Sequence, residues 1–449
     1  MAESTPNQSV FIQGSIPLHV MRMSITGSIG LIGIFLVDFL DMYFLSLLGH
    51  AELAAAVGFA GSVTFFMTYA CVGLSIATGI LLSRLIGQQN FDEAKAQLNG
   101  AMIFTFLITV TMVVCFYPFI DDVLFFLGAR GLTAVYAEDY LRIVLLTLPF
   151  LGLALCFSAA LRSLGAASAA MTTTLMGSLV NGILDPIFIF GLDLSVKGAA
   201  IASALASITM FLTAFFFLSR RYNFFVKIDV HCILPSFKCL LPLAVPAILT
   251  NFATPFANAY LVAKMSDYGD EAVSGFSIIG RIIPVAFAII FALSGAVGPI
   301  VGQNLGAKQI DRIHQTLKFS YIFVVVYVIA CWIVLDAISD WIGGIFNATG
   351  ESAALINLFC DYLCLAHIFV GINFVANAFF NNMGKPSYST IINWLKATIG
   401  TVPFVYVGGL YYGDDGLLWG QSIGNIVFGI IAFVWVKLYL RYCHQLQVR

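Results

Sequence analysis

Seventeen residues between Lys318 and Asp336 decide the fold of this protein: FSYIFVVVYVIACWIVL (residues 319–335) contains no charged side chain. A helix of about 17 to 25 apolar residues spans the hydrocarbon core of a bilayer. Similar stretches recur along the chain, without the alternation of apolar and polar residues that marks barrel strands. Because hydrocarbon offers the backbone no hydrogen-bond partner, these stretches predict transmembrane helices.

Composition supports this interpretation and excludes several functional classes. The chain has 449 residues, of which 60% are hydrophobic and 10% charged, whereas soluble domains average about 25% charged residues. The nine cysteines are scattered and predict no disulfide framework. No block of basic residues indicates a nucleic-acid partner. No Gly-rich phosphate loop with a Lys occurs, so ATP is not predicted to be the energy source. No metalloprotease His pair or nucleophile elbow occurs either, so the sequence predicts neither an enzyme nor a cofactor.

Twelve spans are predicted, with short connections and one longer polar segment near the middle. Their approximate bounds are 18–48, 53–84, 98–120, 138–163, 169–191, 198–218, 238–265, 272–303, 315–336, 352–381, 388–409 and 416–440. The chain then divides into a cytoplasmic tail (1–17), an N-terminal six-helix bundle (18–218), an inter-bundle loop (219–237), a C-terminal six-helix bundle (238–440) and a cytoplasmic tail (441–449). Residues 1–17 have no signal-peptide pattern, so the first helix is expected to be a true span.

The distribution of basic residues predicts the orientation. With both termini in the cytoplasm, sixteen Lys and Arg fall on the cytoplasmic side, Lys396 among them, and four on the opposite side; Arg281 falls within a span. Cytoplasmic loops carry the excess of Lys and Arg in inner-membrane proteins. The sequence therefore predicts a multi-pass protein of a bacterial or archaeal-type plasma (inner) membrane with both termini inside.

The two halves of the chain repeat. Glu52 and Glu271, like Gly165 and Gly384, lie 219 residues apart, and a Gly-Gln pair occurs at residues 87–88 and again at 302–303. Each pair occupies the same place in a half of six spans, and six is even, so the halves share one topology. Two parallel repeats enclosing a cavity are typical of transporters.

Three carboxylates lie well inside predicted spans, away from the span ends, and all are in the first half: Asp38, Asp41 and Asp185. Asp361, near the outer end of the tenth span, is expected to be interfacial. A charge in the bilayer is costly, so such residues are candidates for function. Asp38 and Asp41 share one helical face, and so do Asn181 and Asp185. Burial favours the protonated form of a carboxyl group, so this site can take up and release a proton.

Two further features belong to this candidate site. Pro186 follows Asp185 and weakens the local backbone ladder, and Ser203 lies in the next span among small residues that allow close helix approach. Oxygen atoms of Asp41, Asn181, Asp185 and Ser203 also suit sodium. Alternatively, Asn181 and Asp185 only satisfy backbone groups freed by the proline, and the Ser203 hydroxyl bonds back to its own helix.

The second half has amides where the first half has acids. At an offset of 217 residues, Asn258 stands where Asp41 stands in the first half, and Asn373 and Asn377 share one helical face. These amides either contact substrate or bond helix to helix. Together with Met42, whose soft side chain suits apolar cations, they are the candidate lining of a substrate cavity.

Four stretches resemble the multidrug and toxic-compound extrusion (MATE) family of antiporters. They are DMYFLSLLG (residues 41–49), NGILDPIFIFG (181–191), GAAIA (198–202) and VGQNLGA (301–307). The resemblance covers both halves and implies an all-α membrane protein of twelve helices in two pseudo-symmetric six-helix bundles forming a V. It also implies export of small cationic or amphipathic molecules by a monomer in exchange for protons or sodium.

The resemblance further implies a coupling site in the first bundle, formed by Asp41, Asn181, Asp185 and Ser203. Other branches carry coupling carboxylates in the second bundle, where this sequence has amides, which favours the damage-inducible (DinF-like) branch. An alternative is a lipid-linked precursor flippase of the wider superfamily, but such proteins carry several cavity cations and here only Arg281 lies clearly within a span. A membrane receptor or enzyme scaffold has no need of the repeat.

Overall fold

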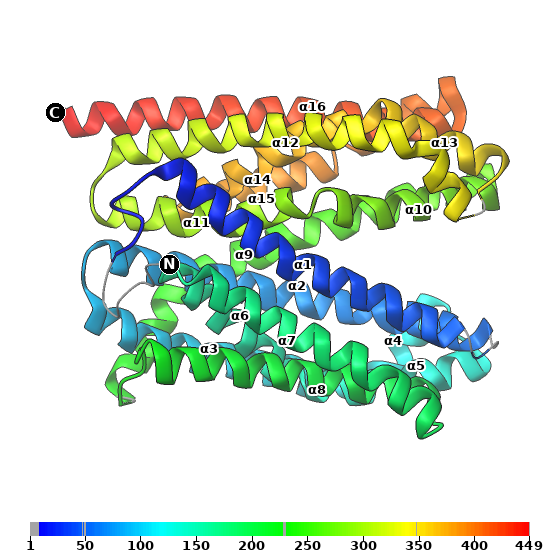
Figure 1. The fold of residues 1–449 in the computed structure, drawn as a ribbon, viewed down its shortest axis with the longest axis horizontal. Helices are drawn as coiled ribbons and strands as arrows, with labels where there is room; N and C mark the ends of the chain where they lie inside the picture. Colours follow the sequence, from blue (N-terminus) through cyan, green and yellow to red (C-terminus); the bar gives the residue numbers. More distant parts are fainter. Residues whose placement is uncertain (1–8, 47, 49–50, 228–229, 347, 449) are drawn as a thin grey trace. The chain divides into compact units, whose positions relative to one another are not determined.

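The computed structural model describes residues 9–46, 48, 51–227, 230–346 and 348–448, and for some residues within helices it describes the backbone alone. All the regular secondary-structure elements in these ranges are helices (Figure 1). The first half contains α1 (Ile16–Ser46), α2 (Ala51–Gly87), α3 (Phe91–Phe116), η1 (Tyr117–Phe119), α4 (Ile120–Leu127), α5 (Gly131–Leu146), α6 (Leu148–Ser163), α7 (Ala167–Pro186), η2 (Ile187–Gly191), α8 (Ser195–Phe216) and η3 (Phe217–Arg221). The second half contains α9 (Val230–Met265), η4 (Ser266–Tyr268), α10 (Asp270–Ala286), α11 (Ala288–Gly306), α12 (Ile310–Ile345), α13 (Gly350–Asp361), η5 (Leu363–Ala366), α14 (His367–Asn382), α15 (Pro386–Ala397) and α16 (Val402–Val448).

The number of spans agrees with the sequence prediction. Ten helical runs in the described ranges are long and apolar enough to cross a membrane, and α5 with α6, bent by 49°, makes an eleventh. The last run, Pro386–Cys443, has 58 residues, about 87 Å of helix at 1.5 Å per residue and far more than one bilayer. Tyr412 and Gly413 break it with non-helical backbone angles. It therefore makes two crossings, which gives twelve and confirms the predicted polytopic all-α fold.

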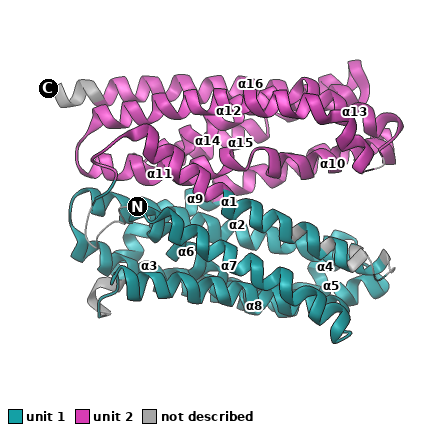
Figure 2. Cartoon of the chain, in the orientation of Figure 1, with its two compact units in different colours: residues 1–10, 29–248 teal, residues 11–28, 249–449 magenta. Residues whose placement is uncertain are grey.

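Two compact units divide the chain at places that differ from the predicted bundle bounds (Figure 2). Unit 1 comprises residues 1–10 and 29–248, and unit 2 comprises residues 11–28 and 249–449. The first turns of α1 belong to unit 2 because Gly27 packs on Ala292 of α11. The start of α9 belongs to unit 1 because Phe237 packs on Phe104 of α3, with 5.0 Å between ring centroids.

The inter-bundle loop is shorter than predicted, and the predicted C-terminal tail continues the last helix. The polar loop predicted at 219–237 gives way to helix at Val230, and the predicted C-terminal tail is helical to Val448. Helices extend past the apolar core because polar side chains do not stop a helix once it has begun, whereas glycine and proline do.

Within unit 1, α7 and α8 form a hairpin and lie side by side along their length (Figure 1). Gly198 permits this close packing, because an added Cβ would approach the carbonyl carbon of Phe188 to 2.8 Å. At the other end of the hairpin, Gly177 packs on Met210. Small residues at helix contacts are the usual way in which membrane helices approach one another.

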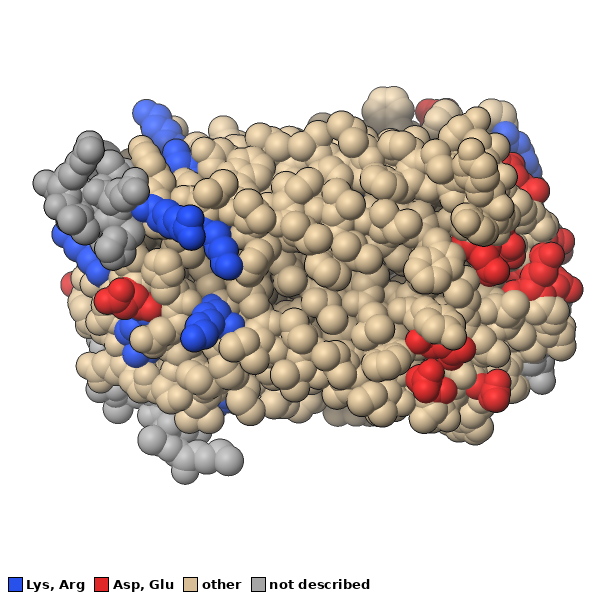
Figure 3. Space-filling model, turned by 90° about the horizontal axis from the view of Figure 1, so that it is seen from above, with Lys and Arg blue, Asp and Glu red and all other residues tan. Residues whose placement is uncertain are grey.

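Charged side chains gather at the ends of the helices. On the face drawn in Figure 3, most basic side chains lie toward one end and most acidic side chains toward the other, and an uncharged band separates them. In unit 2, α12 carries Arg312 and Lys318 near its start and Asp336 and Asp340 near its end. Lys396 departs from this pattern, because it is the eleventh residue of α15. It lies inside the predicted span 388–409, although the count of basic residues assigned it to the cytoplasmic side.

Candidate functional site

The packing of α1 on α7 sets the register of the site in unit 1. A Cβ added at Gly30 would collide with Thr174, and one at Gly33 would approach Leu175 to 3.0 Å. Further along, Gly182 faces Val37 and Leu40. These contacts join residues about 144 positions apart, which shows that the two helices run parallel in a constant register. The same offset joins Asp41 to Asp185.

Asp41 and Asp185 are in contact, with their carboxyl groups within hydrogen-bonding range of each other. Asp185 is fully buried and Asp41 is partly buried. Asn181, itself 4% exposed, donates from Nδ2 to Asp185 Oδ1 over 3.4 Å. One oxygen of each carboxyl group, Asp41 Oδ1 and Asp185 Oδ2, has no further partner among the described residues. Both groups therefore retain capacity to bind a proton or a cation.

The backbone beside the carboxyl pair is irregular. Pro186 ends α7, and because it has no N–H, the carbonyl group of Gly182 loses its helical donor. The next turn, η2, is a π-helical turn closed by a 3.0 Å bond from the Leu192 N–H to the Ile187 carbonyl. Such turns occur often at functional sites. The weakened ladder expected after Asp185 is thus present.

An apolar cluster follows the carboxyl pair along both helices. Phe44, three residues beyond Asp41, packs edge-on against Phe190 of η2, with 6.2 Å between ring centroids. Leu53, Ile189, Val196 and Ala199 complete this cluster. This apolar cluster thus lies beyond the carboxyl groups, toward the end of α1 at Ser46.

Ser203 lies on α8 between Gly198, which packs on Phe188, and Met210, which packs on Gly177. This places Ser203 at the level of Asn181 and Asp185. Its side chain is partly buried, and no hydrogen bond joins it to the carboxyl pair in the described part of the chain. The side chains of Asp38 and Met42, both predicted to contribute, lie outside the described residues. The structure thus brings together Asp41, Asn181 and Asp185, with Ser203 at the same depth.

The amides of unit 2 do not form one group. Asn258 is exposed on α9, whereas Asn373 and Asn377 of α14 are 2% and 7% exposed. Asn377 Nδ2 donates to Asn373 Oδ1 over 2.9 Å, and Asn393 Nδ2 of α15 donates to Asn377 Oδ1 over 2.9 Å. Asn377 therefore bonds helix to helix, and sequence reasoning missed its partner Asn393. The recurrence of Ser389 and Asn393 four residues apart on one helical face was the available signal.

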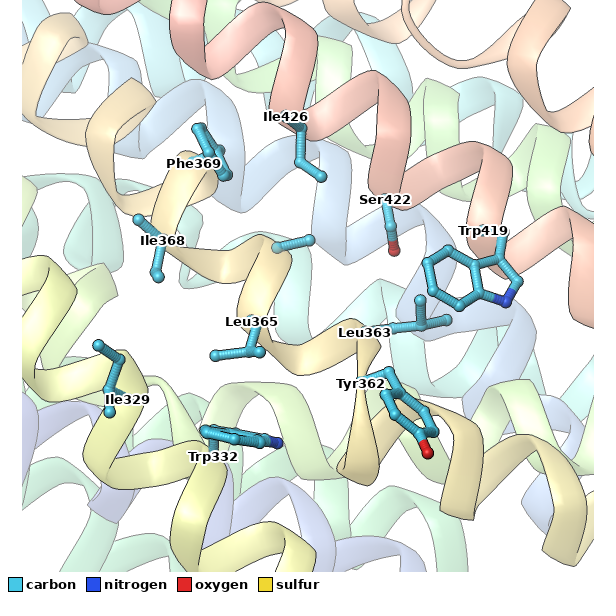
Figure 4. Close-up of a pocket in the computed structure, with 11 residues that line it drawn as sticks. Ile329, Trp332, Tyr362, Leu363, Leu365, Ile368, Phe369, Trp419, Ser422 and Ile426 are labelled. Atoms are coloured by element: carbon cyan, nitrogen blue, oxygen red, sulfur yellow. The ribbon is translucent and has the colours of Figure 1, made fainter.

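A cavity of about 390 Å³ opens in unit 2 between α12, α14 and α16 (Figure 4). Its walls are mostly hydrocarbon and aromatic rings, among them Trp332, Tyr362 and Trp419, and Ser422 also lines it. None of the predicted site residues lines it. In the described part of the chain, no group of three or more His, Cys, Asp or Glu is arranged to hold a metal ion.

The fold is that of known transporters. A structure described as the outward-facing conformation of a multidrug resistance MATE family transporter of the MOP superfamily superposes with a TM-score of 0.92. It is 22% identical in sequence, and the match covers 99% of this chain and 100% of that one.

Two curated proteins are similar over almost their whole length. The FAD transporter of Shewanella oneidensis is 28% identical, with 92% of this chain and 93% of the relative covered. The multidrug export protein MepA of Staphylococcus aureus is 24% identical, with 93% of each covered.

The sequence model of one family, MatE, matches this chain twice, at residues 28–187 and at 246–407. The matches begin 218 residues apart, which agrees with the repeat of 219 seen in the sequence. The two matches together cover most of the chain and include Asp41, Asn181, Asp185 and the amides of α14 and α15. The chain is a multi-pass membrane protein and belongs to the MatE family of transporters.

Proposed function

We propose that the chain is a secondary antiporter of the bacterial inner membrane that exports cationic or amphipathic small molecules in exchange for protons. The contact between Asp41 and Asp185 inside the membrane-spanning part of unit 1 is the observation that carries this proposal. The similarity to a protein named for multidrug export supports the substrate class. The family membership supports transport itself.

The geometry favours a proton as the coupling ion. Of two carboxyl groups in contact, only a protonated one can donate the hydrogen bond between them. Two negative charges at this separation repel strongly where water is excluded. No Lys or Arg of the described residues forms an ion pair with either group. A proton on the pair removes one of the two charges.

Sodium is the alternative coupling ion. Oxygen atoms of Asp41, Asp185, Asn181 and Ser203 are its candidate ligands, since all four residues occur at one depth in unit 1. Hard cations bind such oxygens. Asn181 already directs its Nδ2 toward Asp185, so its Oδ1 remains available to a cation.

Exchange follows if the proton and the substrate cation compete for the same negative charge. The deprotonated pair attracts a cationic substrate, and protonation weakens that attraction. A ligand shifts a conformational equilibrium only through its different affinity for the two states. We therefore expect alternating access in which proton and substrate stabilise different conformations of the carrier.

A second candidate is export of an anionic nucleotide. The relative from Shewanella oneidensis is named an FAD transporter, and FAD carries phosphate groups. Unit 2 supports this candidate through two basic residues in segments predicted from the sequence to span the membrane, Arg281 of α10 and Lys396 of α15. A second basic residue in a predicted span also brings the chain nearer to a lipid-linked precursor flippase, whose cavity carries several cations.

Orientation, oligomeric state and the lack of a cofactor are proposed from the sequence. Both termini are expected in the cytoplasm because most Lys and Arg fall on that side. We expect a monomer that uses neither ATP nor a cofactor. Asp38 and Met42 keep their proposed places beside the ion site and in the substrate cavity, with Asn258.

Proteoliposomes test the proposal directly. Purified chain is reconstituted, and efflux of ethidium is measured under a proton gradient alone and then under a sodium gradient alone. We expect efflux under the proton gradient, its loss in Asp185→Asn and Asp41→Asn, and normal efflux in the control Asp193→Asn, which removes an exposed acid of the same unit. Efflux driven by a sodium gradient alone would mean that sodium, and not the proton, is the coupling ion. Proton-driven efflux that survives Asp185→Asn would refute the proposed site.

A further inference from the structure

Lys396 is a cationic side chain in the middle of a membrane span. It lies about 15 Å from the start of α15 at 1.5 Å per residue, within the apolar run Pro386–Cys443. Its side chain is partly buried. No carboxylate among the described residues forms an ion pair with it. A charge at this depth is costly and is a functional candidate by default.

The helix breaks directly after Lys396. α15 ends at Ala397, and the Gly400 N–H donates to the Leu395 carbonyl over 2.9 Å in place of a regular helical bond. The negative end of a helix stabilises a nearby cation, which gives Lys396 a structural explanation. That stabilisation is modest and offsets only part of the cost of a charge in the bilayer.

The buried amides of α14 and α15 form a ladder with a fixed direction. Asn393 Nδ2 donates to the backbone carbonyl of Ser389 over 2.8 Å and to Asn377 Oδ1 over 2.9 Å. A carbonyl can only accept, so the orientation of Asn393 is determined, and that of Asn377 follows. Asn377 Nδ2 donates to Asn373 Oδ1 over 2.9 Å. The last donor, Asn373 Nδ2, has no partner among the described residues and is buried.

The ladder ends at the level of Lys396. α14 and α15 run antiparallel and touch at Asn377 and Asn393. Asn373 lies four residues before Asn377 on α14, about 6 Å along the helix axis. Lys396 lies three residues after Asn393 on α15, about 4.5 Å along its axis. Because the helices are antiparallel, both displacements have the same direction. On right-handed helices both positions also turn to the same side of the contact, by about 40° and about 60°.

We propose that Lys396 and Asn373 bind an anionic oxygen of the transported substrate, from a phosphate ester or a carboxylate. An ammonium group and an amide N–H₂ without acceptors are complementary to such an oxygen. The inference rests on the proposed function, since it assumes that the chain transports small organic molecules. It assigns the recognition of anionic groups to unit 2, apart from the carboxyl pair of unit 1.

Binding to the purified full chain tests this with matched probes. Flavin mononucleotide and riboflavin differ by one phosphate, and a fluoroquinolone and its methyl ester differ by one carboxylate charge. We expect Lys396→Met to weaken binding of the anionic member of the relevant pair at least about tenfold, while binding of the neutral-group member changes little. Asn373→Leu weakens the same probe, and Lys396→Arg restores part of the affinity. The control is Lys385→Met, which removes an exposed Lys just before the same helix.

The outcomes separate the two proposals. Loss of affinity for phosphate alone or for carboxylate alone identifies the source of the anionic oxygen. Equal loss for both members of each pair, with a lower unfolding temperature, means that Lys396 only stabilises the broken helix, and the inference is then wrong. It is also wrong if the parent chain binds no anionic probe at millimolar concentration. Ethidium efflux under a proton gradient is measured in the same variants: its absence from the parent chain contradicts the antiport proposal, whereas binding that depends on Lys396 would still stand.

Discussion

Asp41 and Asp185 are 144 residues apart in the chain and face each other across the parallel helices α1 and α7. Their contact depends on small residues elsewhere along the interface, since Gly30 and Gly33 bring α1 close to Thr174 and Leu175. The contact between the two carboxyl groups thus depends on helix packing several turns away from them.

Enlarging Gly30 is expected to separate the carboxyl pair. The Val side chain in Gly30→Val collides with Thr174 and forces α1 away from α7. We expect proton-driven ethidium efflux in membrane vesicles to fall about tenfold or more, because a misplacement of about 1 Å in a functional site costs up to a hundredfold. Gly182→Ala is the control on the same interface, since its Cβ would meet Val37 at an ordinary 3.9 Å. Equal activity of both variants would show that register does not matter.

The two carboxyl groups are expected to act as one unit. Asp41→Asn and Asp185→Asn are each expected to lower coupled efflux at least about tenfold, and the double variant should be no worse than the more impaired single one. Groups that share one task lose function non-additively. The measurement is the initial efflux rate under a fixed proton gradient. Losses that multiply in the double variant would indicate two independent sites.

The aromatic contact between Phe44 and Phe190 is expected to limit passage of protons. Phe44→Ala removes one ring of the apolar cluster that follows the carboxyl pair and leaves room for water. We expect a faster decay of a pH gradient across proteoliposomes in the absence of substrate. Phe126→Ala is the control, because Phe126 is 87% exposed. The same decay rate in both variants would exclude a role for the contact.

The amide ladder is expected to stabilise unit 2. Asn393→Ala leaves Asn377 Oδ1 buried without its donor. Interhelical hydrogen bonds in membranes contribute on average about 0.6 and at most about 1.7 kcal/mol, so we expect a loss in that range in the free energy of unfolding. Thermal unfolding in detergent is the measurement, with Asn258→Ala on the exposed face of α9 as control. A loss no larger than the control's would mean that the ladder is not a structural element.

Arg312 is expected to hold the segment before α1 in place within unit 2. Its guanidinium donates to the carbonyl of Phe11 over 2.8 Å, to that of Gln13 over 3.1 Å and to that of Gly14 over 3.1 Å. We expect Arg312→Ala to raise amide hydrogen exchange in residues 11–14 severalfold, because three charge-assisted bonds are lost. Lys318→Ala, at an exposed position on the same helix, is the control. Unchanged exchange would place the anchoring elsewhere.

The sequence predicted the spans well because the bilayer acts on local composition. A run such as residues 319–335 must be helical in hydrocarbon whatever surrounds it. The bundle bounds were less accurate, since the association of residues 18–28 with unit 2 depends on Gly27 meeting Ala292, a contact between distant segments. Lys396 was counted on the cytoplasmic side although the predicted span 388–409 already contains it, and the helix that starts at Pro386 agrees with that span.

The sequence by itself determined the membrane fold, the twelve spans, the repeat and the confinement of the buried acids to the first half, because each depends on residue type and spacing along one chain. Tertiary structure decided which of those residues meet. It placed Asp41 against Asp185, and it paired Asn377 with Asn393. The physical reason is that helix register comes from side-chain contacts between segments more than a hundred residues apart or on neighbouring helices, and no local pattern encodes those contacts.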